Sequence, residues 1–266
     1  ACISFADWPG MFALLKQRRF LPYFTVQALG AFNDNVYRQS IIALLLFLGV
    51  SMSERTLYAN LAPALFILPY FLFSAIAGQI AEKVEKQKLI VITTTMEIVI
   101  MSVAAAGFLL ESMPVLLVAL FLTGTQSTLF GPVKYSIMPQ ALRDDELVGG
   151  NGLVEMGTFL AILAGTIGAG IMMSSTHYAK VVSVAIVGVA VLGYLASRSI
   201  PRAAASTPQL RLTWNIFSQS WATLRMGLGQ TPAVSRSIVG NSWFWFVGAI
   251  YLTQIPAYAK EWMHGD

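Results

Sequence analysis

A cluster of polar residues interrupts the first long apolar stretch of the chain, in the segment GAFNDNVYRQS. Asn33 and Asn35 flank Asp34 in this segment. Arg38 follows four residues after Asp34, so the two charges share one face of a helix. A carboxylate inside an apolar helix suits a structural ion pair with Arg38, or a site that binds a polar substrate or forms a gate. The two flanking amides add hydrogen-bonding capacity that an ion pair does not need, so they favour the second interpretation.

Two further carboxylates lie inside apolar stretches, Glu97 about 13 Å and Glu155 about 12 Å from the starts of their helices at about 1.5 Å per residue. Asn151 lies one turn before Glu155 on the same face, which favours a role for Glu155 in a polar cavity. Glu97 has no such neighbour in the sequence. Its role stays open between support of the helix packing, a protonated and neutral acid, and contact with a substrate.

Metal and redox chemistry find no support in the sequence. Cys2 is the single cysteine, and the two histidines, His177 and His264, are far apart in the chain. A metal site needs clustered ligands and an internal disulfide needs two cysteines, so we predict no metal and no cofactor. The net charge of +4 does not indicate nucleic-acid binding, because the basic residues are scattered over short loops.

The composition predicts whether the chain lies in water or in a lipid membrane. Of the 266 residues, 56% are hydrophobic and only 11% are charged, with a mean hydropathy of +0.66. Soluble domains carry about 25% charged residues, so the chain is predicted to be an all-α membrane protein. A membrane-spanning helix needs about 20 apolar residues. Seven stretches qualify: 20 to 50, 59 to 81, 89 to 110, 115 to 133, 148 to 173, 181 to 198 and 237 to 258.

These stretches divide the chain into four parts. We expect an N-terminal segment over 1–19, a six-helix bundle over 20–198, a linker over 199–236, and the first helix of a second bundle within 237–266. The linker contains an apolar stripe with the spacing of an amphipathic helix, which predicts a helix resting on the membrane interface or, alternatively, on a partner. The stripe consists of Trp214, Phe217, Trp221, Leu224 and Leu228.

The basic residues predict the orientation in the membrane. With the N-terminus in the cytoplasm, thirteen Lys and Arg residues fall in cytoplasmic segments and three fall outside. Cytoplasmic loops are enriched in Lys and Arg, so a cytoplasmic N-terminus is expected.

The segment GQIAEKVEKQK between the second and third stretches resembles the signature loop of the major facilitator superfamily. The matching residues are Gly78, Glu82, Lys83, Lys86 and Lys88. Glu85 stands where that family has a second glycine. The resemblance implies a gating loop between two helices.

A second resemblance covers nearly the whole chain. The segments GAFNDNVYRQS, FGPVKYSIMPQAL, LVGGNGLVEMGTFLAILAGT and SIVGNSWFW are similar to bacterial lysophospholipid transporters of this superfamily, and most similar to the form fused to an acyltransferase and acyl-ACP synthetase. The resemblance implies transport of lysophosphatidylethanolamine and lysophosphatidylglycerol across the bacterial inner membrane for reacylation, by alternating access. The expected substrate path comprises Asp34, Asn35, Arg38, Lys134, Asn151 and Glu155.

Lys134 follows Gly131 and Pro132 at the cytoplasmic end of the fourth stretch. Its ammonium suits a lipid phosphate or an acid that closes this side, and a plain positive-inside anchor is the alternative.

Several features depart from the family or support other classes. The fourth stretch lacks the arginine of many proton-coupled members, which argues against ion coupling.

Superfamily members have two six-helix bundles, so the chain is expected to be a fragment of a twelve-helix transporter. The acyltransferase chemistry of the fused form uses His and Asp five residues apart, but Val182 stands five after His177, so an enzyme is not expected. A carrier of another small molecule or drug remains the alternative function.

The charge distribution makes the topology testable by cysteine scanning after replacement of Cys2. Single cysteines in 82–88 and 199–236 should react only with a reagent applied from the cytoplasmic side, and those in 51–58 and 174–180 only from outside. The opposite labelling pattern would refute the orientation.

Overall fold

A computed structural model describes residues 8–47, 52–213 and 215–261. Cys2, His264, Trp214 and the last residues of the first predicted stretch (48–50) lie outside this part. The chain divides into two compact units, Ala1–Leu212 and Thr213–Asp266, so the division falls within the predicted linker.

All regular elements in the described residues are helices. The first unit contains α1 (Trp8–Ala13), the 3-10 helix η2 (Leu14–Lys16), α2 (Leu21–Phe47), α3 (Met52–Lys83), α4 (Lys86–Leu109), α5 (Met113–Ser136), α6 (Met138–Ala141), α7 (Leu147–Met173) and α8 (Tyr178–Ser197). The second unit contains α9 (Ile216–Leu228) and α10 (Pro232–Glu261).

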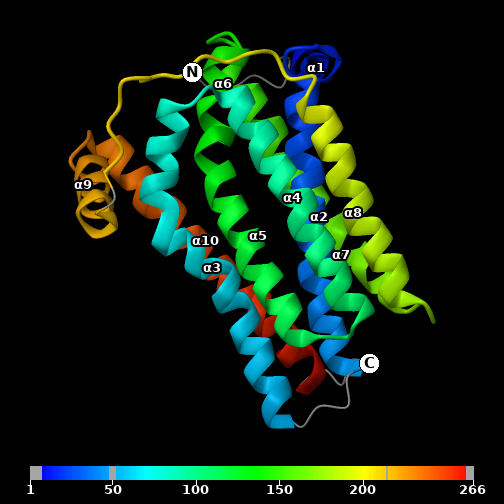
Figure 1. Ribbon diagram of the computed structural model, residues 1–266. Helices are drawn as coiled ribbons and strands as arrows, with labels where there is room; N and C mark the ends of the chain where they lie inside the picture. Colours follow the sequence, from blue (N-terminus) through cyan, green and yellow to red (C-terminus); the bar gives the residue numbers. More distant parts are fainter. Residues whose placement is uncertain (1–7, 48–51, 214, 262–266) are drawn as a thin grey trace. The chain divides into compact units, whose positions relative to one another are not determined.

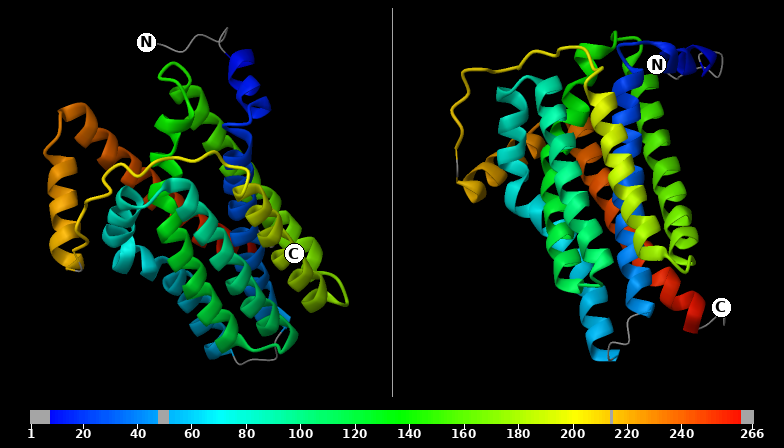
Figure 2. Two further views of the ribbon diagram at one scale, coloured as in Figure 1. Left: turned by 45° about the horizontal axis from the view of Figure 1, so that its top comes forward. Right: turned by 45° about the vertical axis from the view of Figure 1, so that its right-hand side comes forward.

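The six long helices of the first unit form one bundle (Figures 1 and 2). α2 packs between α7 and α8, and α4 packs between α8 and α5. α5 also packs against α3. Because several neighbouring helices are not consecutive in the chain, residues far apart in the sequence meet within the bundle. We call the end formed by the α3–α4 turn, α6 and the segment after α8 the basic end.

Five helices in the described residues are long and apolar enough to cross a membrane, namely α3 (from Asn60), α4, α5, α7 and α8. The fold class predicted from the sequence is thereby confirmed. α2 has 27 residues but is not among the five, and neither is α10. α2 does not qualify because it carries several polar side chains. Several of these side chains are buried within the bundle, namely Gln27, Asn33, Asn35 and Ser40.

The interior of the bundle has two apolar clusters separated by a polar layer. One cluster includes Phe20, Val133 and Leu153 near the basic end, and the other includes Tyr37 and Phe108 toward the opposite end. Between them, α2, α4 and α5 contribute buried polar side chains. This polar layer comprises Gln27, Asn33, Asn35, Thr93, Thr94, Glu97, Thr123, Gln126 and Thr128.

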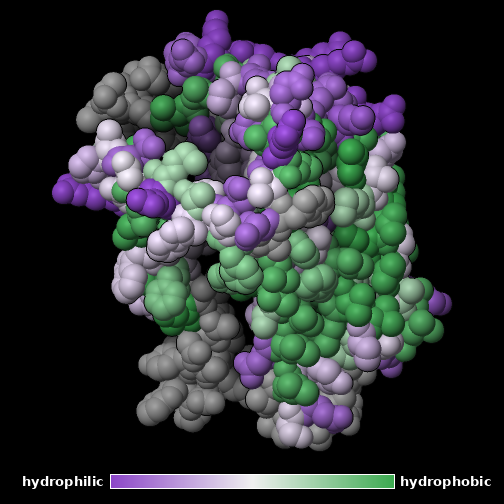
Figure 3. Space-filling model, turned by 60° about the vertical axis from the view of Figure 1, so that its left-hand side comes forward, coloured by the Kyte–Doolittle hydropathy of each residue, from purple (hydrophilic) through white to green (hydrophobic). Residues whose placement is uncertain are grey.

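The outer surface of the bundle, around the enclosed polar layer, is apolar. Large hydrophobic side chains such as Phe71 and Val184, each 74% exposed, point away from the protein. Figure 3 shows hydrophobic residues over the flank of the molecule and hydrophilic residues gathered toward the basic end. Contact of such an extensive apolar surface with water is unfavourable, whereas its contact with lipid is favourable. The chain is therefore a multi-pass membrane protein.

The second unit begins with α9, whose Asn215 side chain caps the helix by accepting the backbone N–H of Ser218 at 3.0 Å. Phe217 and Trp221, from the predicted stripe, are 88% and 66% exposed. α9 packs against α10.

Gly165 on α7 makes the contact with α2 testable. A Cβ added at Gly165 would lie 2.6 Å from the carbonyl oxygen of Phe32, whereas one at Gly170 would meet no atom within 4 Å. Backbone cannot move aside as a side chain can, so we expect Gly165→Ala to destabilise the folded bundle by about 1–3 kcal/mol. Gly170→Ala on the same helix is the control. Thermal unfolding in detergent measures both, and equal midpoints would contradict the packing.

Candidate functional site

Asp34 joins α2 to α5 at the level of the polar layer. Its carboxylate accepts a hydrogen bond from the Ser127 hydroxyl at 3.0 Å. Ser127 also lies 3.3 Å from the Oε1 atom of Gln126, so one hydroxyl proton is shared between two acceptors. A carboxylate accepts several hydrogen bonds, and this one therefore keeps capacity for another donor.

Arg38 does not pair with Asp34. Its guanidinium donates to Asn35 Oδ1 at 2.7 Å and lies 5.5 Å from the centre of the Phe66 ring on α3. No contact within ion-pair distance joins Asp34 and Arg38 in the described residues, so the structure does not show the ion pair that was one of the two interpretations of the sequence. The Asn35 amide in turn donates to the carbonyl of Ala31 at 2.8 Å. Asn35 thus holds Arg38 against α3 and leaves Asp34 to Ser127.

Lys134 and Glu155 meet where α5 and α7 approach the basic end. The ammonium lies 3.4 Å from Glu155 Oε1 and 3.3 Å from the Thr158 hydroxyl. Both contacts are longer than the 2.7–2.9 Å typical of a strong charge-assisted hydrogen bond. The Tyr135 hydroxyl donates to the same carboxylate oxygen at 2.9 Å. Because the Lys134 side chain is only 12% exposed and held loosely, its ammonium is well suited to exchange one anion for another.

Asn151 does not join this group. Its side chain is exposed, and its amide donates to the carbonyl of Leu147 at 2.8 Å within the same helix. The shared helix face expected from the spacing of Asn151 and Glu155 does not produce a contact, because a local backbone acceptor already satisfies the amide.

Gln27 and Thr158 belong to the Lys134 cluster, although the sequence analysis did not single them out. The Thr158 hydroxyl donates to the Val154 carbonyl and accepts from both Gln27 and Lys134. One donor and two acceptors fill its hydrogen-bonding capacity. Gln27 lies two turns before Asp34 on α2, so the two residues share a face of the helix. This spacing is the feature of the sequence that could have identified Gln27 as part of the site. The Tyr23 hydroxyl adds a bond to the Lys134 carbonyl at 2.7 Å, which fixes the end of α5 against α2.

The predicted gating loop is shorter than its motif. α3 ends at Lys83 and α4 begins at Lys86, so Gly78 and Glu82 lie on α3 while Lys88 lies on α4. Glu82 and Lys88 are exposed.

Lys86 from this motif is fully buried rather than exposed. Its ammonium donates to the Ser206 hydroxyl at 2.7 Å, and its backbone N–H donates to the Ala203 carbonyl at 2.9 Å. The backbone N–H of Thr207 donates to the Glu82 carbonyl at 2.9 Å. The segment after α8 is therefore fastened across the α3–α4 turn.

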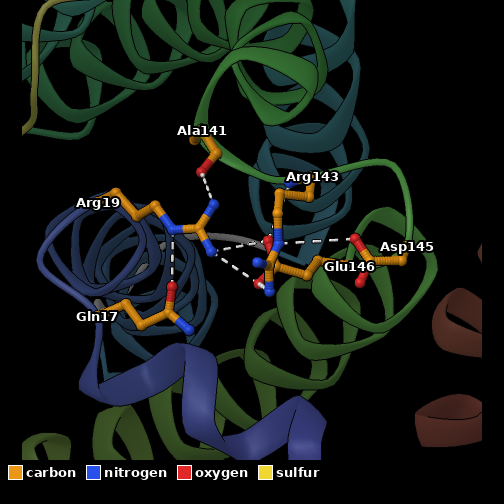
Figure 4. A network of polar contacts seen from close by, with 6 residues as sticks. All are labelled: Gln17, Arg19, Ala141, Arg143, Asp145 and Glu146. Carbon is orange, nitrogen blue, oxygen red and sulfur yellow. Dashed lines mark hydrogen bonds and ion pairs between the residues drawn. The ribbon is translucent and has the colours of Figure 1, made fainter.

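A second polar network fastens the start of α2 to α7 at the basic end (Figure 4). Arg19 donates two hydrogen bonds to the carboxylate of Glu146, at 2.7 and 2.8 Å, and one to the Ala141 carbonyl. Arg143 adds its backbone N–H at 2.9 Å and its guanidinium at 3.1 Å to Glu146. The Arg143 backbone N–H, and then the Arg19 guanidinium, hold the pKa of Glu146 below its ordinary value, against the opposing effect of partial burial.

The chain is similar to known bacterial transporters. It is 26% identical over 238 residues to the lysophospholipid transporter LplT of Serratia proteamaculans, a match that covers 88% of the chain and 56% of the relative. It is 28% identical over 233 residues to LplT of Salmonella newport and of Salmonella typhimurium, covering 86% of the chain and 54% of each relative. No protein-family model matches. These relatives confirm the resemblance to lysophospholipid transporters, and the chain spans about half of their length.

Glu146 makes the second network testable by pH. Its pKa is lower in the folded protein than in the unfolded chain, so its stabilising effect is present above the ordinary carboxyl pKa and is lost as pH falls through the lowered value. We expect Glu146→Gln to lower the thermal midpoint at neutral pH and to make it less sensitive to acid. Asp145→Asn is the control, because this carboxylate is 76% exposed and 3.7 Å from Arg143. Parallel acid profiles for Glu146→Gln and the unmodified protein would contradict the assignment.

Proposed function

We propose that this chain is the N-terminal six-helix bundle, the linker and the seventh helix of a lysophospholipid transporter in the bacterial inner membrane. The main support is the loosely held Lys134–Glu155 pair, which lies beside a buried polar layer in a bundle with an apolar exterior. The similarity to LplT over 86–88% of the chain supports the class of substrate. The thirteen basic residues on one side support a cytoplasmic N-terminus.

The chemistry of a lysophospholipid fits these groups. Such a lipid has one acyl chain and a headgroup with a phosphate, so its carrier needs a few polar groups within apolar walls. In the proposed cycle, the Lys134 ammonium exchanges Glu155 for the lipid phosphate, and Asp34 accepts a hydrogen bond from the headgroup amine or hydroxyl. The return of Lys134 to Glu155 then closes the cytoplasmic side.

The proposal assigns supporting roles to other groups. Alternating access needs two bundles that move against each other around the site, with the second bundle beginning at α10. The motif at Gly78, Glu82, Lys83, Lys86 and Lys88 acts as the gating segment, and Asn35 with Arg38 shapes the path on the α3 side. Reacylation of the lipid would belong to a fused or partner acyltransferase and acyl-ACP synthetase. No residue of this chain is assigned a catalytic role.

Asp34→Asn tests the proposed function. The variant keeps the shape and the bond from Ser127 but removes the charge, so we expect normal membrane insertion and uptake of lysophosphatidylethanolamine lowered about tenfold or more, about 1.4 kcal/mol in the rate-limiting step. Uptake of labelled lipid into spheroplasts that express the complete gene product measures the effect.

Glu111→Gln is the control for this experiment, because Glu111 is an exposed acid at the α4–α5 turn that accepts a bond from Tyr178. Uptake in Glu111→Gln should match the unmodified protein. Unchanged uptake in Asp34→Asn would rule out the direct role of Asp34, and absence of uptake in the unmodified protein would rule out the substrate.

A further inference from the structure

Glu97 is an acid buried in the bundle without a cation. It lies on α4 and is 5% exposed, and its only hydrogen-bond partner in the described residues is the Asn33 amide on α2, at 2.8 Å from Oε1. No Lys or Arg of the described residues lies within ion-pair distance of it. An ionised carboxylate held by one neutral amide inside a membrane protein carries a large desolvation cost, which protonation removes.

The helices around Glu97 offer little charge to offset this cost. α5 has no charged residue before Lys134, which pairs with Glu155 at the basic end, and α8 has none between Lys180 and its C-terminal end. α4 itself carries charge only at Lys86, Lys88 and Glu97. The charges close to Glu97 are therefore those of α2.

In the described residues, the two charged residues of α2, Asp34 and Arg38, have polar partners that Glu97 lacks. Asp34 is only partly buried, and its carboxylate accepts the Ser127 hydroxyl at 3.0 Å. Arg38 itself is directed to Asn35 and the Phe66 ring. Two neighbouring buried acids do not both remain ionised, and the better-solvated one keeps the charge. Asp34 has a hydroxyl partner and partial exposure, whereas Glu97 is 5% exposed and has one neutral amide, which favours the proton on Glu97.

The Asn33 side chain supplies an independent observation. Asn33 is 0% exposed, and its Nδ2 atom donates to Glu97 Oε1 and to the Ile186 carbonyl on α8, at 2.8 and 3.2 Å. Both of its N–H groups are used. Its Oδ1 atom, in contrast, is buried and has no partner in the described residues. An orphaned buried acceptor is costly, and only a donor next to it relieves the cost.

We propose that Glu97 and Asn33 form a proton-binding site, in which the Glu97 carboxyl takes up one proton from water and its new O–H donates to Asn33 Oδ1. The acid and the amide then form a cyclic pair with one hydrogen bond in each direction. The uptake adds one proton and removes one negative charge, and no other bond changes. This pair fastens α2 to α4 and, through Ile186, to α8. It does not depend on which substrate the protein carries.

Infrared spectroscopy of the purified complete gene product in lipid nanodiscs tests this site. The unmodified protein should show the carbonyl stretch of a buried protonated carboxyl group at neutral pH, and Glu97→Gln should lose it. Asp34→Asn, the matched control on α2, should keep it. Absence of the band from the unmodified protein, or its loss in Asp34→Asn alone, would overturn the proposal.

Thermal unfolding provides a second measurement. Because the folded protein holds a proton that the unfolded chain releases, its stability should fall from neutral to alkaline pH. Glu97→Gln reproduces the cyclic pair with an amide, so its midpoint should fall less over the same range. Equal alkaline slopes for the two proteins would overturn the proposal. If Glu97→Gln does not fold, absence of the band from the unmodified protein, or its loss in Asp34→Asn, still overturns the proposal.

Discussion

The need to pair every polar group inside a bilayer governs this structure. Lipid offers no hydrogen-bond partners, so polar side chains on membrane helices have to find partners within the protein. The bundle meets most of this requirement by gathering many of them into a layer between two apolar clusters, although Asn33 Oδ1, Gln27 Oε1 and Ser40 Oγ have no partner in the described residues. The exterior can then be apolar at the same depth at which the interior is polar.

α2 is the helix through which this layer is connected. Its side chains bond to α5 through Asp34, to α7 through Gln27 and to α4 and α8 through Asn33. This explains why α2 lies between α7 and α8, where its polar faces are covered. A change in the position of α2 would disturb several polar contacts together.

At the basic end, two networks limit how far the helices can separate. Arg19, Glu146 and Arg143 tie α2 to α7, and Lys86 with Ser206 ties α4 to the segment after α8. Between them, Lys134 and Glu155 form a weaker contact at 3.4 Å. The contacts of Glu146 with Arg19 and of Lys86 with Ser206 are shorter than the Lys134–Glu155 contact at the candidate site.

The sequence by itself determined the helical membrane class, the positions of the long helices and the presence of acids at depth, because apolar length and spacing are local properties. Asp34 and Glu155 were candidates from their residue types within apolar helices, whereas Lys134 was a candidate from the family resemblance. Only the tertiary structure decided their partners. Asp34 contacts Ser127, 93 residues away, instead of Arg38, and Lys86 of the predicted gating loop is fully buried. Asn151 turns to its own helix, while Glu97 meets Asn33. Helical periodicity fixes which residues share a face, but the rotation and packing of each helix against its neighbours fix what that face touches.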